Sequence, residues 1–291
     1  MQNQEIKPVL PHVPSAANLS TMPDTNQTQY SPQPNSLQPL LIGMALVPLV
    51  LLATLTLLCY WTPLDLAVTR QFFSTQGERF PYTETFLANT IYDYGPIPAV
   101  VFGVGSVAAW IGSFLFTRLR SVRKGALFCS LAILIGPGIL INTVLKPNWG
   151  RPRPCDTVVF GGQYEYIPPG TIGPYEMAKS FPSGHASMGF VFLLPAFLLL
   201  RKNPKAAMCV FAVGFMCGAG VGASRIAEGG HYLSDIAWSG AIVYFTGLTL
   251  YVGMYGWKQP DQSAPSTAET LPFSLESQTD NVENVRKSSA A

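Results

Sequence analysis

Charged residues are scarce in this sequence. Asp, Glu, Lys and Arg make up only 12% of the 291 residues, whereas hydrophobic residues reach 48%. An average soluble domain carries roughly 25% charged residues. The hydrophobic residues also come in long blocks, which is typical of segments whose solvent is the lipid bilayer. The shortage of charge therefore argues against an ordinary soluble domain.

Other absences narrow the function further. The net charge is only +2, with no basic tract or nucleic-acid motif, which argues against a nucleic-acid partner. None of the five cysteines forms a C-x-x-C pair, so we expect neither a disulfide framework nor a cysteine metal site. No cationic start leads directly into an apolar stretch, so no signal peptide is predicted. The cysteines are Cys59, Cys129, Cys155, Cys209 and Cys217.

The hydrophobic blocks lie between two polar tails. Residues 1–38 and 260–291 have few apolar residues and are predicted to be disordered. The part between them, 39–259, is predicted to be an all-α, polytopic membrane domain, because a helix satisfies its own backbone hydrogen bonds in lipid. We expect six transmembrane helices, at about 39–61, 95–117, 125–145, 184–200, 206–223 and 236–257.

Basic residues in the short connections predict the orientation. They cluster between the second and third helices and between the fourth and fifth, so both connections are expected to be cytoplasmic. Both termini are then also cytoplasmic, and the loops 146–183 and 224–235 face the other side. The basic residues concerned are Arg118, Arg120, Arg123, Lys124, Arg201, Lys202 and Lys205.

Glycines recur every four residues in the fifth helix, at Gly214, Gly218 and Gly222. Small residues at this spacing let two membrane helices approach closely. We therefore predict close helix packing along this face.

The two outward loops hold most of the reactive side chains. Four cations stand beside apolar helices there, and the nearby acids Glu228 and Asp235 are fewer. An anionic ligand would balance the charge, and Arg suits phosphate oxygens well. Ser183 and Gly184 mark the expected start of a helix, where free N–H groups also favour an anion. The cations are Lys146, Arg151, Arg153 and Arg225.

Two of the three histidines lie in the same loops, and His12 lies in the N-terminal tail. His231 and Asp235 are four residues apart and are expected to share one face. A carboxylate bonded to one imidazole nitrogen leaves the other free to attack. His185 is then available as general acid toward a leaving alkoxide. This set of groups needs no metal or other cofactor.

The motifs that contain these residues resemble the three signature motifs of the type 2 phosphatidic acid phosphatase superfamily, in the same order. They are Lys146-x6-Arg153-Pro154, Pro182-Ser183-Gly184-His185 and Ser224-Arg225-x5-His231-x3-Asp235. The resemblance covers about residues 90–257. It implies that His231 is the nucleophile, Asp235 its partner and His185 the acid. It assigns phosphate binding to Lys146, Arg153, Ser183, the Gly184 amide and Arg225.

Arg151 falls in the variable part of the first motif. Two roles stay open for it: binding a second anionic group, or pairing with Glu228.

The resemblance implies a multi-pass phosphatase of the cytoplasmic membrane with its site on the periplasmic or extracytoplasmic side. It would hydrolyse a phosphomonoester or pyrophosphate through a phosphohistidine, without a cofactor. Since the site adjoins the bilayer, we expect an amphiphilic lipid phosphate as substrate.

The identity of that lipid is narrowed by the first loop. Trp149-Gly-Arg-Pro-Arg-Pro followed by Phe160-Gly-Gly is similar to bacterial envelope phosphatases, including those that act on lipid A. Lipid A is therefore favoured, with undecaprenyl diphosphate and phosphatidylglycerophosphate as alternatives. A transporter of an anionic substrate is the alternative from another class, but the ionisable residues cluster in same-side loops, not at mid-membrane. The oligomeric state stays open.

Overall fold

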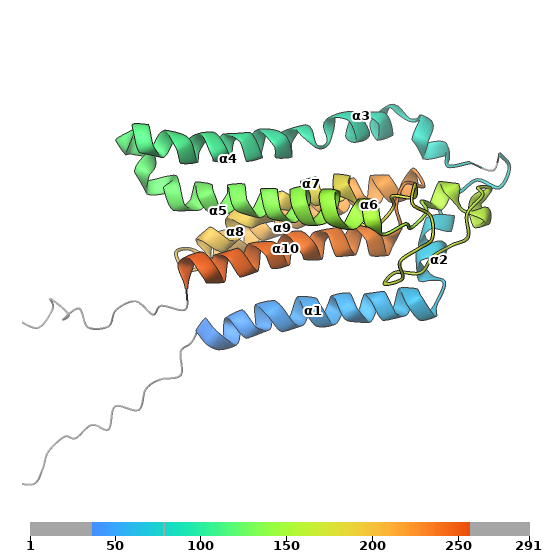
Figure 1. Ribbon diagram of the computed structural model, residues 1–291, viewed down its shortest axis with the longest axis horizontal. Helices are drawn as coiled ribbons and strands as arrows, with labels where there is room; N and C mark the ends of the chain where they lie inside the picture. Colours follow the sequence, from blue (N-terminus) through green and yellow to red (C-terminus); the bar gives the residue numbers. More distant parts are fainter. Residues whose placement is uncertain (1–36, 78, 257–291) are drawn as a thin grey trace, which may run out of the picture. The chain divides into compact units, whose positions relative to one another are not determined.

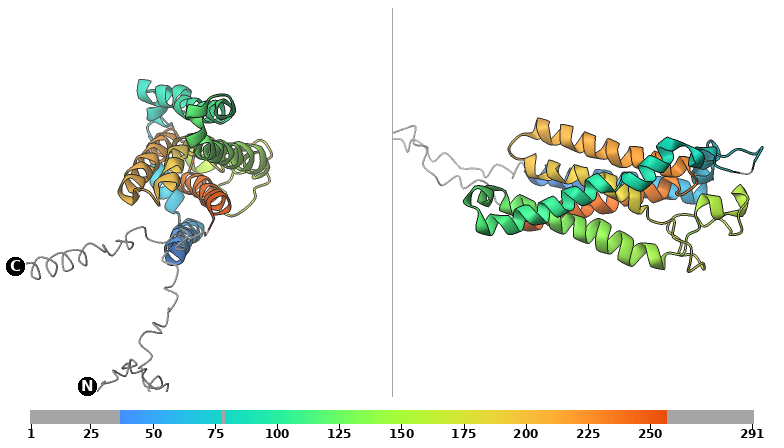
Figure 2. Two further views of the ribbon diagram at one scale, coloured as in Figure 1. Left: turned by 90° about the vertical axis from the view of Figure 1, so that its left-hand side faces the viewer. Right: turned by 90° about the horizontal axis from the view of Figure 1, so that it is seen from above.

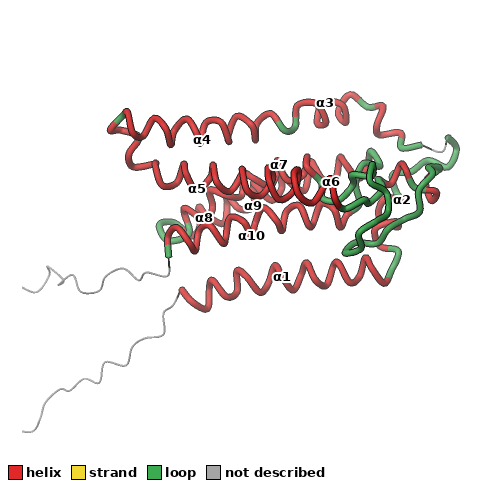
Figure 3. The backbone as a smooth tube through the Cα atoms, viewed as in Figure 1, coloured by secondary structure: helices red, strands yellow, loops and turns green. Residues whose placement is uncertain are grey.

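The computed structural model describes residues 37–77 and 79–256, which form a bundle of helices (Figures 1 and 3). No strand forms within these ranges, so the predicted all-α class is confirmed. The predicted tails lie outside the described residues, except that 37–38 already belong to the first helix.

Helix α1 (Leu37–Trp61) lies alongside α10 (Leu233–Tyr255). The hydroxyl of Tyr244 on α10 donates to the carbonyl of Met44 on α1 at 2.8 Å. Most of the remaining α1 surface is apolar and exposed, as expected for a helix that faces lipid. A short helix, α2 (Leu64–Arg70), follows after a connection of two residues and lies at the end of the bundle that contains the motifs (Figure 1).

The second and third helices are longer than predicted. Helix α3 (Phe86–Tyr94) leads into α4 (Ile97–Leu115), because Pro96 is tolerated at a helix start. The next helix comprises α5 (Arg123–Ile133), a π-helical segment (Leu134–Leu145) and α6 (Lys146–Asn148). The predicted bounds of these two helices were placed where the hydrophobic runs end. The helices extend further because polar residues can also be helical when the backbone N–H and C=O groups are hydrogen-bonded.

The π-helical segment begins at Leu134 and contains Pro137, whose ring prevents an ordinary α-helical ladder. Side chains contribute to the widened turn: Asn142 donates to the Pro137 carbonyl at 2.7 Å, and Thr143 to that of Gly138 at 3.0 Å. The widened segment ends directly before Lys146, so it sets the direction in which the first motif leaves the helix.

The remaining helices form the centre of the bundle. Helices α7 (Gly184–Phe190) and α8 (Leu194–Leu199), joined by a 3-10 turn, are followed by α9 (Pro204–Ala227) and α10. Five helices of the described chain are long and apolar enough to cross a membrane, and Gly184–Leu199 is a shorter sixth apolar helix. The predicted polytopic bundle is confirmed, and its count of six spans is approximate.

The glycines of α9 pack as predicted. A Cβ on Gly214 would lie 2.1 Å from the Leu193 nitrogen, and one on Gly218 would lie 2.2 Å from the Phe190 ring. These positions have no room for a side chain, so α9 lies directly against the α7–α8 helix.

The basic connections and the motif residues lie at opposite ends of the bundle. The connections between α4 and α5 and between α8 and α9, which carry the basic clusters, lie at one end (Figures 1 and 2). The start of α1 and the end of α10 lie at the same end. The loop that comes after α6, together with α2 and α3, lies at the opposite end with the motif residues (Figure 1).

Candidate active site

The three motifs meet at one end of the bundle. Lys146 begins α6, Ser183 caps the start of α7, and Arg225 lies in the last turn of α9. Asp235 occupies the first turn of α10. The predicted outward loop 224–235 is shorter than expected, because α9 continues to Ala227 and α10 begins at Leu233.

His231 and Asp235 face each other, as their spacing predicts. The Nδ1 atom of His231 lies 3.6 Å from the Oδ2 atom of Asp235, and both side chains are buried. Nδ1 makes no hydrogen bond in this geometry, although such contacts often shorten when substrate binds. Asp235 is fixed by the backbone N–H of Tyr232, which donates to Oδ2 at 2.9 Å.

The environment of His231 favours a neutral imidazole. Burial lowers the pKa of His231 to about 4, although the Asp235 carboxylate acts in the opposite direction. Since Nδ1 faces Asp235, the other ring nitrogen, Nε2, is the one free to attack. A neutral, oriented imidazole is the form that a nucleophilic histidine needs.

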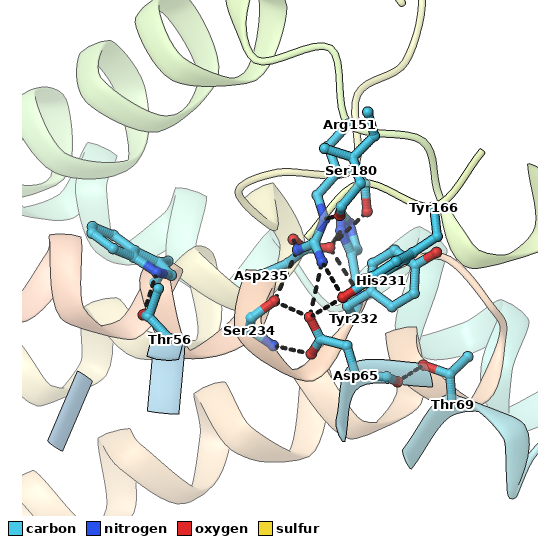
Figure 4. A network of polar contacts seen from close by, with 12 residues as sticks. Thr56, Asp65, Thr69, Arg151, Tyr166, Ser180, His231, Tyr232, Ser234 and Asp235 are labelled. Atoms are coloured by element: carbon cyan, nitrogen blue, oxygen red, sulfur yellow. Dashed lines mark hydrogen bonds and ion pairs between the residues drawn. The ribbon is translucent and has the colours of Figure 1, made fainter. Parts of the chain in front are cut away.

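Arg151 has neither of the roles left open for it. Its side chain is fully buried, and its Nη1 atom donates to the Oδ1 atom of Asp235 at 2.5 Å (Figure 4). Its Nη2 atom donates to Asp65 at 2.8 Å. Burial by itself lowers the pKa of Arg151, but the two carboxylates outweigh it and raise the pKa above its usual value. Glu228 pairs instead with Arg225.

His185 belongs to a stack of three side chains. Its ring lies parallel to that of Tyr92 with centroids 4.8 Å apart, and the Arg225 guanidinium carbon lies 4.7 Å from the Tyr92 centroid. Tyr92 therefore contacts both the candidate acid and a residue predicted to bind phosphate, and it restricts the position of both.

The cations of the motifs gather around the two histidines. Lys146, Arg153 and Arg225 all lie close enough to act electrostatically on His185. The Nζ atom of Lys146 is 3.4 Å from the place that a Cβ on Gly184 would take, so the start of α7 lies next to this cation. Three cations therefore lie near His185 and the start of α7, and of these Arg225 is paired with Glu228.

Ser183, which is predicted to bind phosphate, also makes a contact within the protein. Its side-chain oxygen accepts from the Ala186 amide at 3.3 Å and so caps α7. The hydroxyl proton remains available as a donor. Capping and phosphate binding are therefore compatible for Ser183.

Two residues of this region were missed from the sequence. Tyr92 lies on α3, a segment that hydrophobicity alone did not identify. Asp65 gave a clearer signal, since a carboxylate in the apolar segment Leu64–Arg70 beside a membrane helix is costly without a function. The predicted first helix ends at 61, and α2 is too short to be identified as a membrane span.

Replacing Tyr92 with leucine is expected to lower kcat about 10-fold, because stacking and cation–π contacts worth about 1–2 kcal/mol are lost. Initial rates of phosphate release by purified protein measure the effect. Tyr94→Leu is the matched control, since Tyr94 is 62% exposed. Equal rates for Tyr92→Leu and wild type would contradict a role for the stack.

No group of three or more His, Cys, Asp or Glu side chains suited to a metal ion occurs among the described residues. The metal-independent reaction stays a prediction.

Comparison with known proteins agrees with the motifs. Residues 125–259 match the model of the PAP2 superfamily. A lipid A 4'-phosphatase of Francisella tularensis subsp. novicida is 29% identical over 198 residues, which cover 67% of this chain and 88% of that protein. A lipid A 4'-phosphatase of Rhizobium etli is 38% identical over 142 residues, covering 47% and 51%. A lipid A 1-phosphatase of the same organism is 31% identical over 128 residues, covering 44% of each chain. No solved structure matches significantly.

Proposed function

Since residues 125–259 carry a PAP2 superfamily domain and the protein is a membrane phosphatase, we propose that it dephosphorylates lipid A through a phosphohistidine intermediate. The observation that carries this proposal is a buried His231 facing Asp235, with His185 and the cations Lys146, Arg153 and Arg225 within electrostatic range of one another at the same end of the bundle. The relatives support the choice of lipid, because all three are lipid A 4'- or 1-phosphatases.

The first chemical step transfers the phosphoryl group to His231. Nε2 attacks phosphorus, the bond to the leaving oxygen breaks, and His185 gives that oxygen a proton. The His231 ring then carries a positive charge, which Asp235 stabilises from the Nδ1 side. Lys146, Arg153 and Arg225 stabilise the phosphoryl oxygens, which is the main task of a protein in phosphoryl transfer.

The second step restores the enzyme. His185, now neutral, removes a proton from water, and the hydroxide attacks phosphorus and breaks the P–N bond. Inorganic phosphate leaves and His231 returns to the neutral form. His185 is thus acid in the first step and base in the second.

An apolar cavity of about 630 Å³ supports an amphiphilic substrate. Its lining includes Gly95, Gly189 and Val221. These residues lie three or four positions from Tyr92, His185 and Arg225 respectively, which is about one helical turn. The cavity therefore begins one turn below the stack and continues along α9 to Cys209, where it could hold an acyl chain.

Filling this cavity is expected to discriminate between substrates. Val213→Trp places a large ring in it, and we expect the KM for a long-chain lipid to rise about 10-fold or more while a soluble phosphomonoester is unaffected. Val104→Trp on α4 is the matched control, since Val104 is 64% exposed and does not line the cavity. An equal loss on both substrates would argue against an acyl-chain site.

Phosphate release by the detergent-purified protein, with EDTA present, tests the proposed function. The panel is lipid A, undecaprenyl diphosphate, phosphatidylglycerophosphate, phosphatidic acid and a soluble phosphomonoester. Preferential release from lipid A is expected, and mass spectrometry of the product identifies the 1- or 4'-position. Preference for another member would replace lipid A as substrate, and no release from any would overturn the proposal.

We also propose that the site faces the periplasm or another extracytoplasmic space. The basic connections lie at the opposite end of the bundle from the site, which supports a cytoplasmic location for them and for both termini (Figure 1).

A further inference from the structure

A second buried carboxylate lies close to the His231–Asp235 pair, and it comes from outside the segment that matches the PAP2 superfamily. Asp65 on α2 has no exposed surface. Its Oδ1 atom accepts from the Ser234 amide at 2.9 Å, and its Oδ2 atom accepts from the Ser234 hydroxyl at 2.5 Å (Figure 4). The same Oδ2 atom accepts from Arg151 at 2.8 Å. Asp65 thus joins α2 to the first turn of α10.

Arg151 connects Asp65 to the catalytic carboxylate. One terminal nitrogen donates to Asp65 and the other to Asp235, while Nε donates to the Ile167 carbonyl at 2.8 Å. The guanidinium carbon also lies 4.5 Å from the Tyr232 ring centroid. Every nitrogen of the side chain therefore has a partner, and its orientation is fixed.

In this arrangement the two carboxylate oxygens of Asp235 have different partners. Oδ1 is bonded to Arg151, whereas Oδ2 accepts from Ser180 at 2.6 Å and faces His231. A guanidinium prefers to grip a carboxylate with two parallel hydrogen bonds. If Arg151 did so here, it would compete with His231 for Oδ2. Asp65 prevents this by holding the second terminal nitrogen.

The charge of the cluster matters as well. Asp65 and Asp235 are two carboxylates around the single cation Arg151 in a buried site. Burying an ion pair costs desolvation free energy, and burying an additional negative charge costs more unless a positive charge develops beside it. His231 becomes positively charged when it takes the phosphoryl group.

We propose that Asp65 is a positioning residue for the phosphoryl transfer. It holds Arg151 on one oxygen of Asp235, leaves the other oxygen for His231, and supplies negative charge when the imidazole becomes cationic. This inference rests on the proposed phosphohistidine mechanism.

Asp65→Asn removes this charge with little change in shape. We expect the rate of phosphoenzyme formation, measured by rapid quench with ³²P-labelled lipid, to fall about 10- to 100-fold, as for other residues that orient a reactive group. The inhibition constant of inorganic phosphate should change less than about 2-fold, because Asp65 bonds to Arg151 and Ser234 and not to the cations that bind phosphate. A merely structural role would not separate these two quantities.

Glu84→Gln is the matched control, since Glu84 is also an ion-paired carboxylate, but its pair with Arg79 is exposed. It should leave both quantities unchanged. Ser234→Ala is the second variant: it removes hydrogen bonds to Asp65 and Arg151 but no charge, and several-fold slower phosphoenzyme formation is expected.

The outcomes separate the two proposals. If the wild type forms no phosphoenzyme, the proposed function fails. If the wild type forms it and Asp65→Asn forms it equally fast, or loses phosphate affinity in parallel, only the role of Asp65 is overturned. If Asp65→Asn does not fold, an unchanged rate in Ser234→Ala overturns that role.

Discussion

Replacing His231 with alanine is expected to reduce kcat at least about 10³-fold, because the proposed reaction passes through a covalent bond to this side chain. A labelled phosphoenzyme is expected in the wild type and not in His231→Ala. Because a P–N bond is labile to acid, acid-quenched samples are neutralised rapidly before the label is measured. Phosphate release from lipid A in the presence of EDTA measures the loss of turnover.

The kcat/KM of the wild type is expected to depend on pH in a defined way. The pKa of His231 is lowered to about 4 by burial, so the imidazole is neutral at neutral pH and becomes protonated as the pH falls through that value. Protonation of His231 should therefore reduce kcat/KM only near pH 4, not near the ordinary histidine value of about 6.5.

His12→Ala is the control for this substitution, since His12 belongs to the predicted N-terminal tail and to none of the three motifs. Its turnover should equal that of the wild type. A retained inhibition constant for inorganic phosphate in His231→Ala would show that the cationic site is intact. Phosphate release that survives in His231→Ala at a rate near wild type would refute the assignment of the nucleophile.

The features that could be predicted from the sequence are those that depend on local composition and spacing. The apolar runs identify the helices because lipid tolerates little else, and the spacing of His231 and Asp235 places them face to face. The glycines of α9 also indicate close packing from the sequence alone, because a glycine has no side chain to hold a neighbouring helix away.

Helix ends and long-range partners were not predictable in the same way. Arg225 lies within α9 although it comes after the apolar run, because Glu228 neutralises it one turn further on. Two roles stayed open for Arg151 from the sequence, a second anionic group or a pair with Glu228, but its partners are Asp65 and Asp235, which are separated from it by 86 and 84 positions along the chain. Such pairings depend on how the helices pack, which local sequence does not specify.

Substituting His185 with glutamine is expected to have the second large effect, and its size should depend on the leaving group. On a lipid phosphate, kcat should fall about 10²- to 10⁴-fold, the usual contribution of general acid–base catalysis. An aryl phosphate leaves as a stabilised phenolate and needs less help from an acid. The first step on that substrate should therefore be slowed much less.

The second step gives this prediction its sharpest form. Water must still be activated by His185 acting as a base, whatever the leaving group was. His185→Gln should therefore accumulate phosphoenzyme from an aryl phosphate, visible by rapid quench as a burst of phenol without matching phosphate. His231→Ala should show no burst, and the double variant should resemble His231→Ala. Equal losses on the lipid and the aryl phosphate, with no burst, would mean that His185 neither protonates the leaving group nor activates water, and that its contact with Tyr92 reflects packing alone.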